Sequence, residues 1–332
     1  MTSDAAMLAV EGLDVSFGQL RGRIKVLDSV SFAIAPGEVL GLVGESGSGK
    51  SVTALALMAL LGEQGRIEAG QILFEGRDLA GLAPAEMLQI RGRSISMIFQ
   101  EPTTSLNPVL PVGFQIAEVL IAHLGMGRAA ALSQAALLMK QVGIPAAAER
   151  VGDYPHQMSG GMRQRVMIAM AIACRPRLLI ADEPTTALDV TMQAQILRLI
   201  KDLQTREGMA VLMITHDLGV IARVAHRVAV MYAGQIVETG PVRDIFRSPR
   251  HPYTRMLLRS IPRVGRRQVR LRAIAGTTPS AAAMPSACRF HPRCPDAIAL
   301  CRSEAPPLET EQGRQVRCWR AHESGLISQE AV

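Results

Sequence analysis

Short, continuous apolar runs alternate with amphipathic segments along most of the chain. Residues 39–43 (VLGLV), 178–182 (LLIAD) and 210–216 (AVLMITH) are almost entirely apolar, which is typical of strands buried on both faces of a sheet. Residues 113–125 and 190–207 repeat apolar positions every three or four residues, which predicts helices with one buried face. Together these segments predict an α/β fold.

The remaining segments predict two smaller subdomains. Residues 8–18, 25–38 and 70–79 read as short strands separated by turn residues, and they predict an antiparallel β subdomain. From Pro84 the pattern turns helical, so we expect a helical subdomain over about 84–158.

The composition changes after Gly240, where Arg and Pro become frequent and regular periodicity fades. We therefore expect a main domain over residues 1–250 and a carboxyl-terminal extension over 251–332. Residues 241–332 hold 16 Arg, no Lys and 7 acidic residues, a net charge of +9, whereas the whole chain carries +7. A basic extension can bind nucleic acid, an anionic membrane surface or an acidic partner, or can be a solvated linker.

Composition and apolar run length indicate where the protein works. Of the 332 residues, 48% are hydrophobic and 3% aromatic, which is typical of a globular protein with an aliphatic core. The amino terminus lacks a basic segment followed by an apolar one, and no apolar run is long enough to span a bilayer. We therefore expect a cytosolic protein whose thiols stay reduced.

The sequence GESGSGKS, residues 44–51, has the pattern of a phosphate-binding loop. It follows a predicted buried strand and precedes a predicted helix. Glycines let backbone N–H groups turn toward phosphates, and the helix presents its positive end. Lys50 can reach the outer phosphates, and the Ser51 hydroxyl can hold Mg²⁺. The expected nucleotide-binding residues are Gly44, Glu45, Ser46, Gly47, Ser48, Gly49, Lys50, Ser51 and Val52.

An acidic pair supplies the second half of a hydrolytic site. Asp182 ends the predicted strand LLIAD, where its carboxylate can bind the Mg²⁺ shell. Glu183 follows and is placed to orient and deprotonate the attacking water. An acidic pair after a strand can simply cap a loop, but beside a phosphate loop this pair predicts catalysis.

The motif SGGMRQR, which begins at Ser159, predicts a second anion site. Ser159 is a candidate N-cap, and Gly160 and Gly161 leave the amino end of the following helix bare. Two phosphate sites that face different ways suggest that two chains enclose nucleotide between them.

The phosphate loop, FQEP, SGGMRQR, ADEP, ALD and THD occur in an order and spacing that resemble the ABC ATPase family. The resemblance implies a P-loop NTPase fold and an ATP site. It implies that Gln100 contacts Mg²⁺ and couples to membrane subunits, and that His216 holds the γ-phosphate. Residues 159–161 would bind the γ-phosphate held by the partner subunit, and Asp189 of ALD would belong to the nucleotide site. Phe17 is the candidate to stack on adenine; an ordinary core position in a strand is the alternative.

Further stretches resemble the D-type ATPases of oligopeptide and dipeptide importers. They are residues 100–116, residues 248–258 and GGMRQR, in which Met162 replaces the glutamine common in the family. The resemblance implies a peripheral subunit on the cytoplasmic face of the bacterial inner membrane. Its expected partners are a second ATPase subunit of the same or a different kind, two transmembrane permease subunits and, indirectly, an extracytoplasmic peptide-binding protein. Importers of nickel or glutathione use close relatives, so these solutes are alternatives.

A soluble ABC ATPase that acts on nucleic acid is the alternative class. A DNA-repair ATPase would carry a long coiled-coil insertion, and a translation-type protein would carry two ATPase halves, whereas this sequence has one phosphate loop and no such insertion. A module that had lost catalysis would lack Glu183 or His216, and both are present. We therefore expect an ATP hydrolase coupled to transport, with no nucleic-acid partner.

Four of the five cysteines lie near the carboxyl end: Cys288, Cys294, Cys301 and Cys318. Four thiolates are a full ligand set for Zn²⁺ or an iron–sulfur cluster. Structural zinc sites usually pair ligands about two to four residues apart, and that pairing is missing, so the spacing favours a cluster over zinc. The resemblance to the D-type ATPases implies a [4Fe–4S] cluster, with Zn²⁺ and then free thiols as alternatives. We thus expect a small metal-binding extension.

Overall fold

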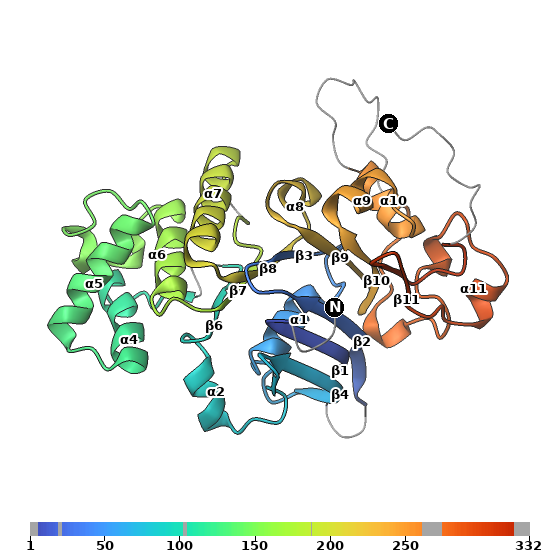
Figure 1. Cartoon of the computed structure of the whole chain (residues 1–332), viewed down its shortest axis with the longest axis horizontal. Coiled ribbons are helices and arrows are strands. Elements are labelled where there is room, and N and C mark those ends of the chain that lie inside the picture. The colour runs from blue at the N-terminus through green and yellow to red at the C-terminus, as the bar shows by residue number, and fades with distance from the viewer. Residues whose placement is uncertain (1–5, 19–21, 102–104, 187, 261–273, 322–332) are drawn as a thin grey trace.

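A computed structural model describes residues 6–18, 22–101, 105–186, 188–260 and 274–321. Its strands form two sheets, one of four strands and one of eight. The larger sheet crosses the middle of the molecule, with a helical lobe at one end and the carboxyl-terminal extension at the other (Figure 1). The predicted α/β architecture is confirmed.

The smaller sheet is antiparallel and has the strand order β2-β1-β4-β5. Its strands are β1 (Leu8–Phe17), β2 (Ile24–Ile34), β4 (Gly65–Phe74) and β5 (Arg77–Asp78). Alternate residues point inward, so that Leu13 and Val15 of β1 are fully buried. This sheet is the predicted antiparallel β subdomain.

The larger sheet has the order β11-β12-β10-β9-β3-β8-β7-β6, and the five strands from β9 to β6 are parallel. These five are β3 (Val39–Val43), β6 (Ile95–Ile98), β7 (Leu178–Asp182), β8 (Ala210–Thr215) and β9 (Arg227–Tyr232). The apolar runs predicted as buried strands are β3, β7 and β8. Strands buried on both faces explain why these runs are apolar without alternation.

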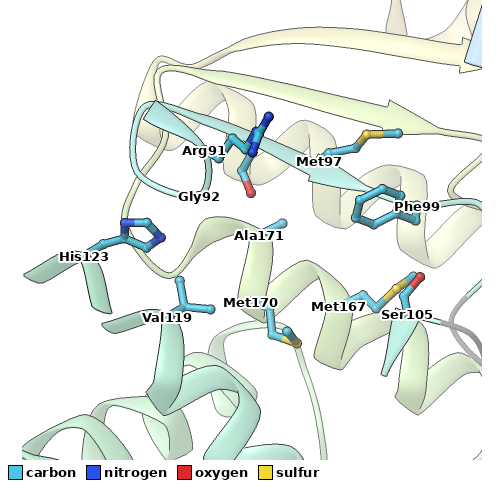
Figure 2. A pocket seen from close by; sticks show the side chains of 11 residues that line it. Arg91, Gly92, Met97, Phe99, Ser105, Val119, His123, Met167, Met170 and Ala171 are labelled. Atoms are coloured by element: carbon cyan, nitrogen blue, oxygen red, sulfur yellow. The ribbon is translucent and has the colours of Figure 1, made fainter. Parts of the chain in front are cut away.

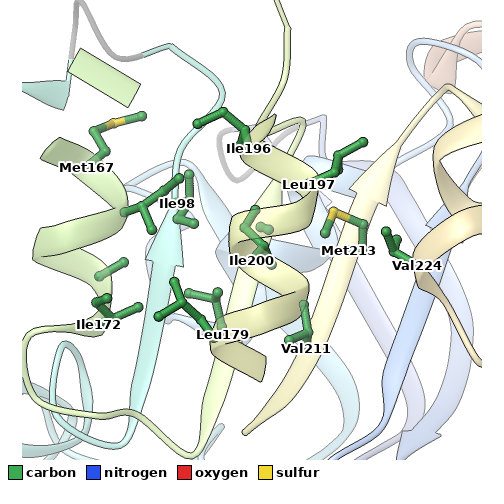
Figure 3. Packing of buried hydrophobic residues seen from close by; sticks show 14 of the residues in the cluster. Ile98, Met167, Ile172, Leu179, Ile196, Leu197, Ile200, Val211, Met213 and Val224 are labelled. Atoms are coloured by element: carbon green, nitrogen blue, oxygen red, sulfur yellow. The ribbon is translucent and has the colours of Figure 1, made fainter. Parts of the chain in front are cut away.

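Each face of the parallel sheet has its own core. Helices α6 (Gly160–Ile172), α7 (Val190–Glu207) and α8 (Leu218–Val224) cover one face, and α1 (Lys50–Leu57) with the smaller sheet covers the other. Figure 3 shows Ile200 of α7 above the strands that carry Leu179 and Val211. The next residues along these strands, Ile180 and Leu212, point into the opposite core.

The helical lobe differs from the predicted helical subdomain over 84–158 in one respect. Its helices are α2 (Pro84–Ile90), α4 (Val112–Leu124) and α5 (Arg128–Gln141), followed by α6. Strand β6 interrupts this stretch and pairs with β7 in the larger sheet. Four residues are too few for their periodicity to separate a strand from a helix, so the pattern missed β6. Among the described helices, none is long and apolar enough to cross a membrane.

The extension returns to the larger sheet. It is preceded by β10 (Gln235–Pro241) and α9 (Val242–Arg247). Its own elements are α10 (Pro252–Arg259), α11 (Leu300–Ser303), β11 (Glu309–Glu311) and β12 (Arg314–Val316). Strand β12 pairs with β10, and the Phe290 ring lies 5.1 Å from that of Tyr232 and 5.4 Å from that of Tyr253, centroid to centroid. The extension therefore shares a core with the rest of the chain, and the division at residue 250 stays a prediction.

Candidate active site

Four neighbouring parallel strands bring the predicted site residues to one edge of the larger sheet. The phosphate loop follows β3, His216 follows β8, Asp182 ends β7, and Gln100 comes two residues after β6. Carboxyl ends of parallel strands face the same way, so residues distant in the sequence meet there.

The phosphate loop has the conformation that its glycines allow. Gly49 has a φ of 106° and makes no side-chain cap for α1, so the amino end of this helix is bare. At Gly44, a Cβ would come within 2.1 Å of the Met231 carbonyl oxygen. Free N–H groups at a helix start form an anion site.

Lys50 lies buried inside this loop, with 5% of its surface exposed. Its Nζ donates to the carbonyl oxygens of Gly44 at 2.9 Å and Glu45 at 3.0 Å. Burial lowers the pKa of Lys50, and the carboxylates of Glu183 and Asp182 oppose that change. An ammonium held by two loop carbonyls has a third proton left for a phosphate oxygen.

Asp182 has the features of a magnesium ligand. It is 4% exposed, and its Oδ1 has no hydrogen-bond partner in the described structure. Burial raises the pKa of Asp182, although a hydrogen bond from Ser51 opposes this change. Because Mg²⁺ is bound through carboxylates, waters and hydroxyls, an unpaired carboxylate oxygen beside Ser51 fits this ion.

Glu183 is held by three side chains. It accepts hydrogen bonds from Gln100 Nε2 at 3.2 Å and Thr186 Oγ1 at 2.9 Å, and its Oε1 lies 3.1 Å from His216 Nδ1. Burial favours a higher pKa, yet the hydrogen bonds from His216 and Thr186 hold the pKa of Glu183 below its ordinary value. The carboxylate is therefore ionised and oriented. Its backbone has a φ of 45°, which is unusual for a residue other than glycine.

The residues of SGGMRQR lie on the helical lobe. Ser159 caps α6, and its Oγ accepts from the Met162 N–H at 3.3 Å. A Cβ at Gly161 would come within 2.2 Å of Met192 Cε, so this glycine lies against the flexible end of a side chain from α7. No hydrogen bond within the described residues joins 159–161 to the phosphate loop. The structure therefore does not bring this motif into the chain's own site.

Asp189 and Phe17 have structural contacts beside their predicted roles. Asp189 caps α7, with its Oδ1 accepting from the Met192 N–H at 2.9 Å. Phe17 ends β1. Its side chain, like that of Val52, is partly buried against the core that lies between the parallel sheet and the smaller sheet. Adenine stacking by Phe17 and a nucleotide role for Asp189 stay predictions.

Three contacts at the site carry no sequence signal. Thr186 binds Glu183, while Tyr253 and Arg293 from the extension both contact Glu45 of the phosphate loop. Tyr253 and Arg293 lie more than 200 residues from Glu45, and only the fold brings them together.

The four cysteines of the extension lie near one another. Cys301 is buried and the other three are half-buried. The thiol of Cys288 interacts electrostatically with that of Cys301, and the thiol of Cys318 with both. Burial raises the pKa of Cys294 to about 12 and that of Cys318 to about 11.

Backbone N–H groups face three of these sulfur atoms. Cys288, Cys294 and Cys318 accept backbone hydrogen bonds from Phe290, Asp296 and Arg320, respectively, and these bonds favour the thiolate. However, no group of three or more His, Cys, Asp or Glu side chains in the described residues is arranged to hold a metal ion. The predicted metal-binding extension is therefore not shown.

Comparison with known proteins decides the family. Residues 27–186 match the family described as ABC transporter, and residues 237–301 match the oligopeptide/dipeptide transporter C-terminal region. The chain is 50% identical to the dipeptide transport ATP-binding protein DppD of Escherichia coli over 314 residues, which cover 94% of this chain and 96% of that protein. This chain belongs to the ATPase subunits of ABC transporters.

Other relatives agree with this assignment. The ABC ATPase is 51% identical over 330 residues to a putative peptide import ATP-binding protein of Brucella abortus, covering 96% of this chain and 98% of that protein. Its fold resembles the ATP-binding cassette MJ0796, solved as a dimer in a post-hydrolysis state bound to ADP and Pi. That similarity has a TM-score of 0.64 and 27% identity, and it covers 71% of this chain and 99% of that one.

Replacing Glu183 by Gln tests whether its carboxylate acts as the base. Gln keeps the size of the side chain and removes the basic oxygen, so we expect MgATP binding to persist and turnover to fall at least ~10²-fold. Steady-state phosphate release and equilibrium nucleotide binding measure the two quantities. Glu86→Gln, at an exposed ion pair with Arg77, is the matched control and should leave both unchanged. Turnover like that of the wild type in Glu183→Gln would remove Glu183 from the mechanism.

Proposed function

We propose that this ABC ATPase binds and hydrolyses ATP to power the import of dipeptides or oligopeptides. The observation that carries the proposal is the match of 94% to 96% of the chain, extension included, to ATP-binding proteins of peptide transport and import. The ionised Glu183 beside Lys50 and Asp182 supports hydrolysis rather than binding alone.

The phosphate loop would hold the ATP phosphates. The third N–H of the Lys50 ammonium would donate a hydrogen bond to a phosphate oxygen, and its positive charge would offset the negative charge of the phosphates. The bare amino end of α1 adds further N–H donors. Ser51, Asp182 and Gln100 would hold Mg²⁺, and the unpaired Oδ1 of Asp182 supports this assignment. When bound there, Mg²⁺ would offset the negative charge that develops on the phosphates during phosphoryl transfer.

Glu183 and His216 would act on the attacking water and the γ-phosphate. Glu183 orients the water and accepts its proton, while Thr186 and Gln100 hold the carboxylate in place. The side chain of His216 is 64% exposed, so it is free to donate to a phosphate oxygen.

A second ATPase subunit, of the same or a different kind, would complete the site. Ser159, Gly160 and Gly161 lie outside this chain's own site, and they would bind the γ-phosphate held by the partner. The dimer of the similar cassette MJ0796 supports this arrangement. Phe17 would contact the adenine, and Asp189 would belong to the nucleotide site.

A groove beside Gln100 supports docking on two transmembrane permease subunits. Its lining includes Arg91, Gly92, Ser96, Met97, Phe99, Ser105, Val119, His123, Met167, Met170 and Ala171. Figure 2 shows Phe99 on the side of the groove that faces Met167 of α6, with Met170 farther along that helix. Methionines adapt to irregular apolar partners, and Phe99 is 39% exposed. We assign the groove to a cytoplasmic segment of a permease, which Phe99 would connect to Gln100 and the ATP site.

We propose that the chain is a peripheral subunit on the cytoplasmic face of the bacterial inner membrane. An extracytoplasmic peptide-binding protein would deliver the substrate to the permeases and contact this chain only through them. Nickel and glutathione are the alternative solutes, and an ATPase that acts on nucleic acid is the alternative class.

Uptake by reconstituted vesicles tests the function. The chain is purified with its co-eluting permease and ATPase subunits and placed in lipid vesicles with the binding protein. We expect dipeptide accumulation that requires ATP, and ATPase activity that depends on the permeases. Met170→Asp introduces a charge into the groove while leaving Gln100 and Glu183 intact, so transport should be lost while nucleotide binding remains.

Other outcomes of the same measurement identify the alternatives. Uptake of Ni²⁺ or glutathione in place of dipeptide would contradict the substrate class and leave the ATPase role standing. ATPase activity that responds to DNA or RNA and ignores the permeases would contradict the transport role itself.

We further propose that Cys288, Cys294, Cys301 and Cys318 hold a [4Fe–4S] cluster in an extension over residues 251–332. Four neighbouring thiols, three of which accept backbone hydrogen bonds, support a thiolate-ligated group. The spacing of these cysteines, which has no pair two to four residues apart, favours a cluster over Zn²⁺.

Metal and sulfide analysis tests the cluster. Protein purified without oxygen should contain iron and acid-labile sulfide in nearly equal amounts, with zinc well below stoichiometric. Each Cys→Ser change in the extension should lower iron content, because a hydroxyl is a poor ligand for iron, and Cys174→Ser is the matched control. Colourless protein that holds one zinc ion per chain would contradict the cluster and support a zinc site made of the four thiolates. Neither metal, in protein from iron-replete cells, would remove both.

A further inference from the structure

The carboxyl-terminal extension contacts the phosphate loop directly. Arg293 Nη1 and Nη2 donate to the two carboxylate oxygens of Glu45 at 2.7 Å and 3.0 Å, a bidentate pair. The side chain of Arg293 is 6% exposed and that of Glu45 is 26% exposed. Because the pair is largely shielded from water, removing Arg293 would leave the Glu45 carboxylate poorly solvated and without its counter-charge, which is costly.

Other residues of the extension hold the same loop position. Thr278 Oγ1 donates to Glu45 Oε2 at 2.8 Å, and the Glu45 N–H donates to the Tyr253 hydroxyl at 2.9 Å. Arg293 is itself held, since its Nε donates to the Ala275 carbonyl at 3.0 Å and its guanidinium lies over the Tyr232 ring. Glu45 is thus held at its backbone and at its side chain.

The position of Glu45 affects the groups that meet phosphate. The Glu45 carbonyl accepts from the Ser48 N–H at 3.2 Å and from Lys50 Nζ at 3.0 Å. A shift of Glu45 therefore moves both the turn of the loop and the Lys50 ammonium. The charge of Glu45 matters as well, because an unpaired carboxylate beside the loop would repel the phosphates of a nucleotide.

We propose that Arg293, together with Tyr253 and Thr278, is a positioning residue of the ATP site, and that the extension is required for tight nucleotide binding. The inference rests on the proposed nucleotide role of residues 44–52. Arg293 shapes the loop through Glu45 and cancels its negative charge, without contacting nucleotide itself.

The structure offers a matched control within the same turn. Arg289 is another buried arginine of the extension, and it pairs with Asp28 of β2 at 2.6 Å. Exposed side-chain fractions are 11% for Arg289 and 25% for Asp28, close to those of the Arg293–Glu45 pair. Both pairs anchor the extension to the rest of the chain, but only Arg293 contacts the phosphate loop.

The test compares MgADP affinity and thermal unfolding in full-length variants. Arg293→Ala should weaken MgADP binding at least about tenfold, the size expected when one hydrogen bond to a charged group is lost. Arg289→Ala should lower the unfolding temperature about as much as Arg293→Ala does. It should change MgADP affinity less than about twofold. The double variant Arg293→Ala with Glu45→Gln should regain part of the affinity, because it removes the unpaired carboxylate.

Several results would overturn the inference. MgADP affinity in Arg293→Ala equal to that of the wild type would do so, as would equal weakening by Arg289→Ala. If Arg293→Ala does not fold, Tyr253→Phe decides: it deletes only the acceptor of the Glu45 N–H, and unchanged affinity would count against the inference. A wild-type chain that binds no MgADP would instead contradict the proposed function, so the two failures are distinguishable.

Discussion

The parallel pairing of β3, β8, β7 and β6 is the constraint on which the site depends. In this register Val43 pairs with Thr215, and Asp182 pairs with Ile214, so the strands end almost level at one edge. The phosphate loop, His216, the acidic pair and Gln100 each begin where one of these strands ends. A slip of one residue in β7 would turn Asp182 toward the opposite face and remove it from the site.

Buried charge at this edge explains the contacts around it. Lys50 and Asp182 are 5% and 4% exposed, and a buried charge is costly unless it is paired or bonded. Loop carbonyls hold the Lys50 ammonium, and Ser51 bonds Asp182, which leaves one carboxylate oxygen for a cation. Next to these residues, Arg293 of the extension pairs with the carboxylate of Glu45 in the phosphate loop. The hydrogen bonds of Lys50 and Asp182 offset part of the cost of burying the two charges, and the remaining Asp182 oxygen fits the proposed Mg²⁺.

Sequence patterns predicted the parts of the fold whose signal is local. The runs at 39–43 and 178–182, helix α7 and the phosphate loop were predicted at their places because their apolar periodicity and glycines depend on neighbours in the chain. Strand β6 and strands β11 and β12 were missed, since three or four residues carry no clear period. Thr186 beside Glu183 and the Arg293–Glu45 pair were missed too, because no local pattern reports a partner that only the fold supplies. The family resemblance named the site residues.

A single substitution in the SGGMRQR motif tests most directly whether two subunits share the ATP site. Gly160→Asp places a carboxylate at the amino end of α6, where it would repel the γ-phosphate of a partner's nucleotide. The measurement is MgADP affinity of the isolated chain together with ATP turnover of the assembled transporter. A shared site predicts affinity within about twofold of the wild type and a large loss of turnover. Loss of nucleotide binding by the isolated, folded chain would show that Gly160 serves its own Lys50 site and would contradict the shared site.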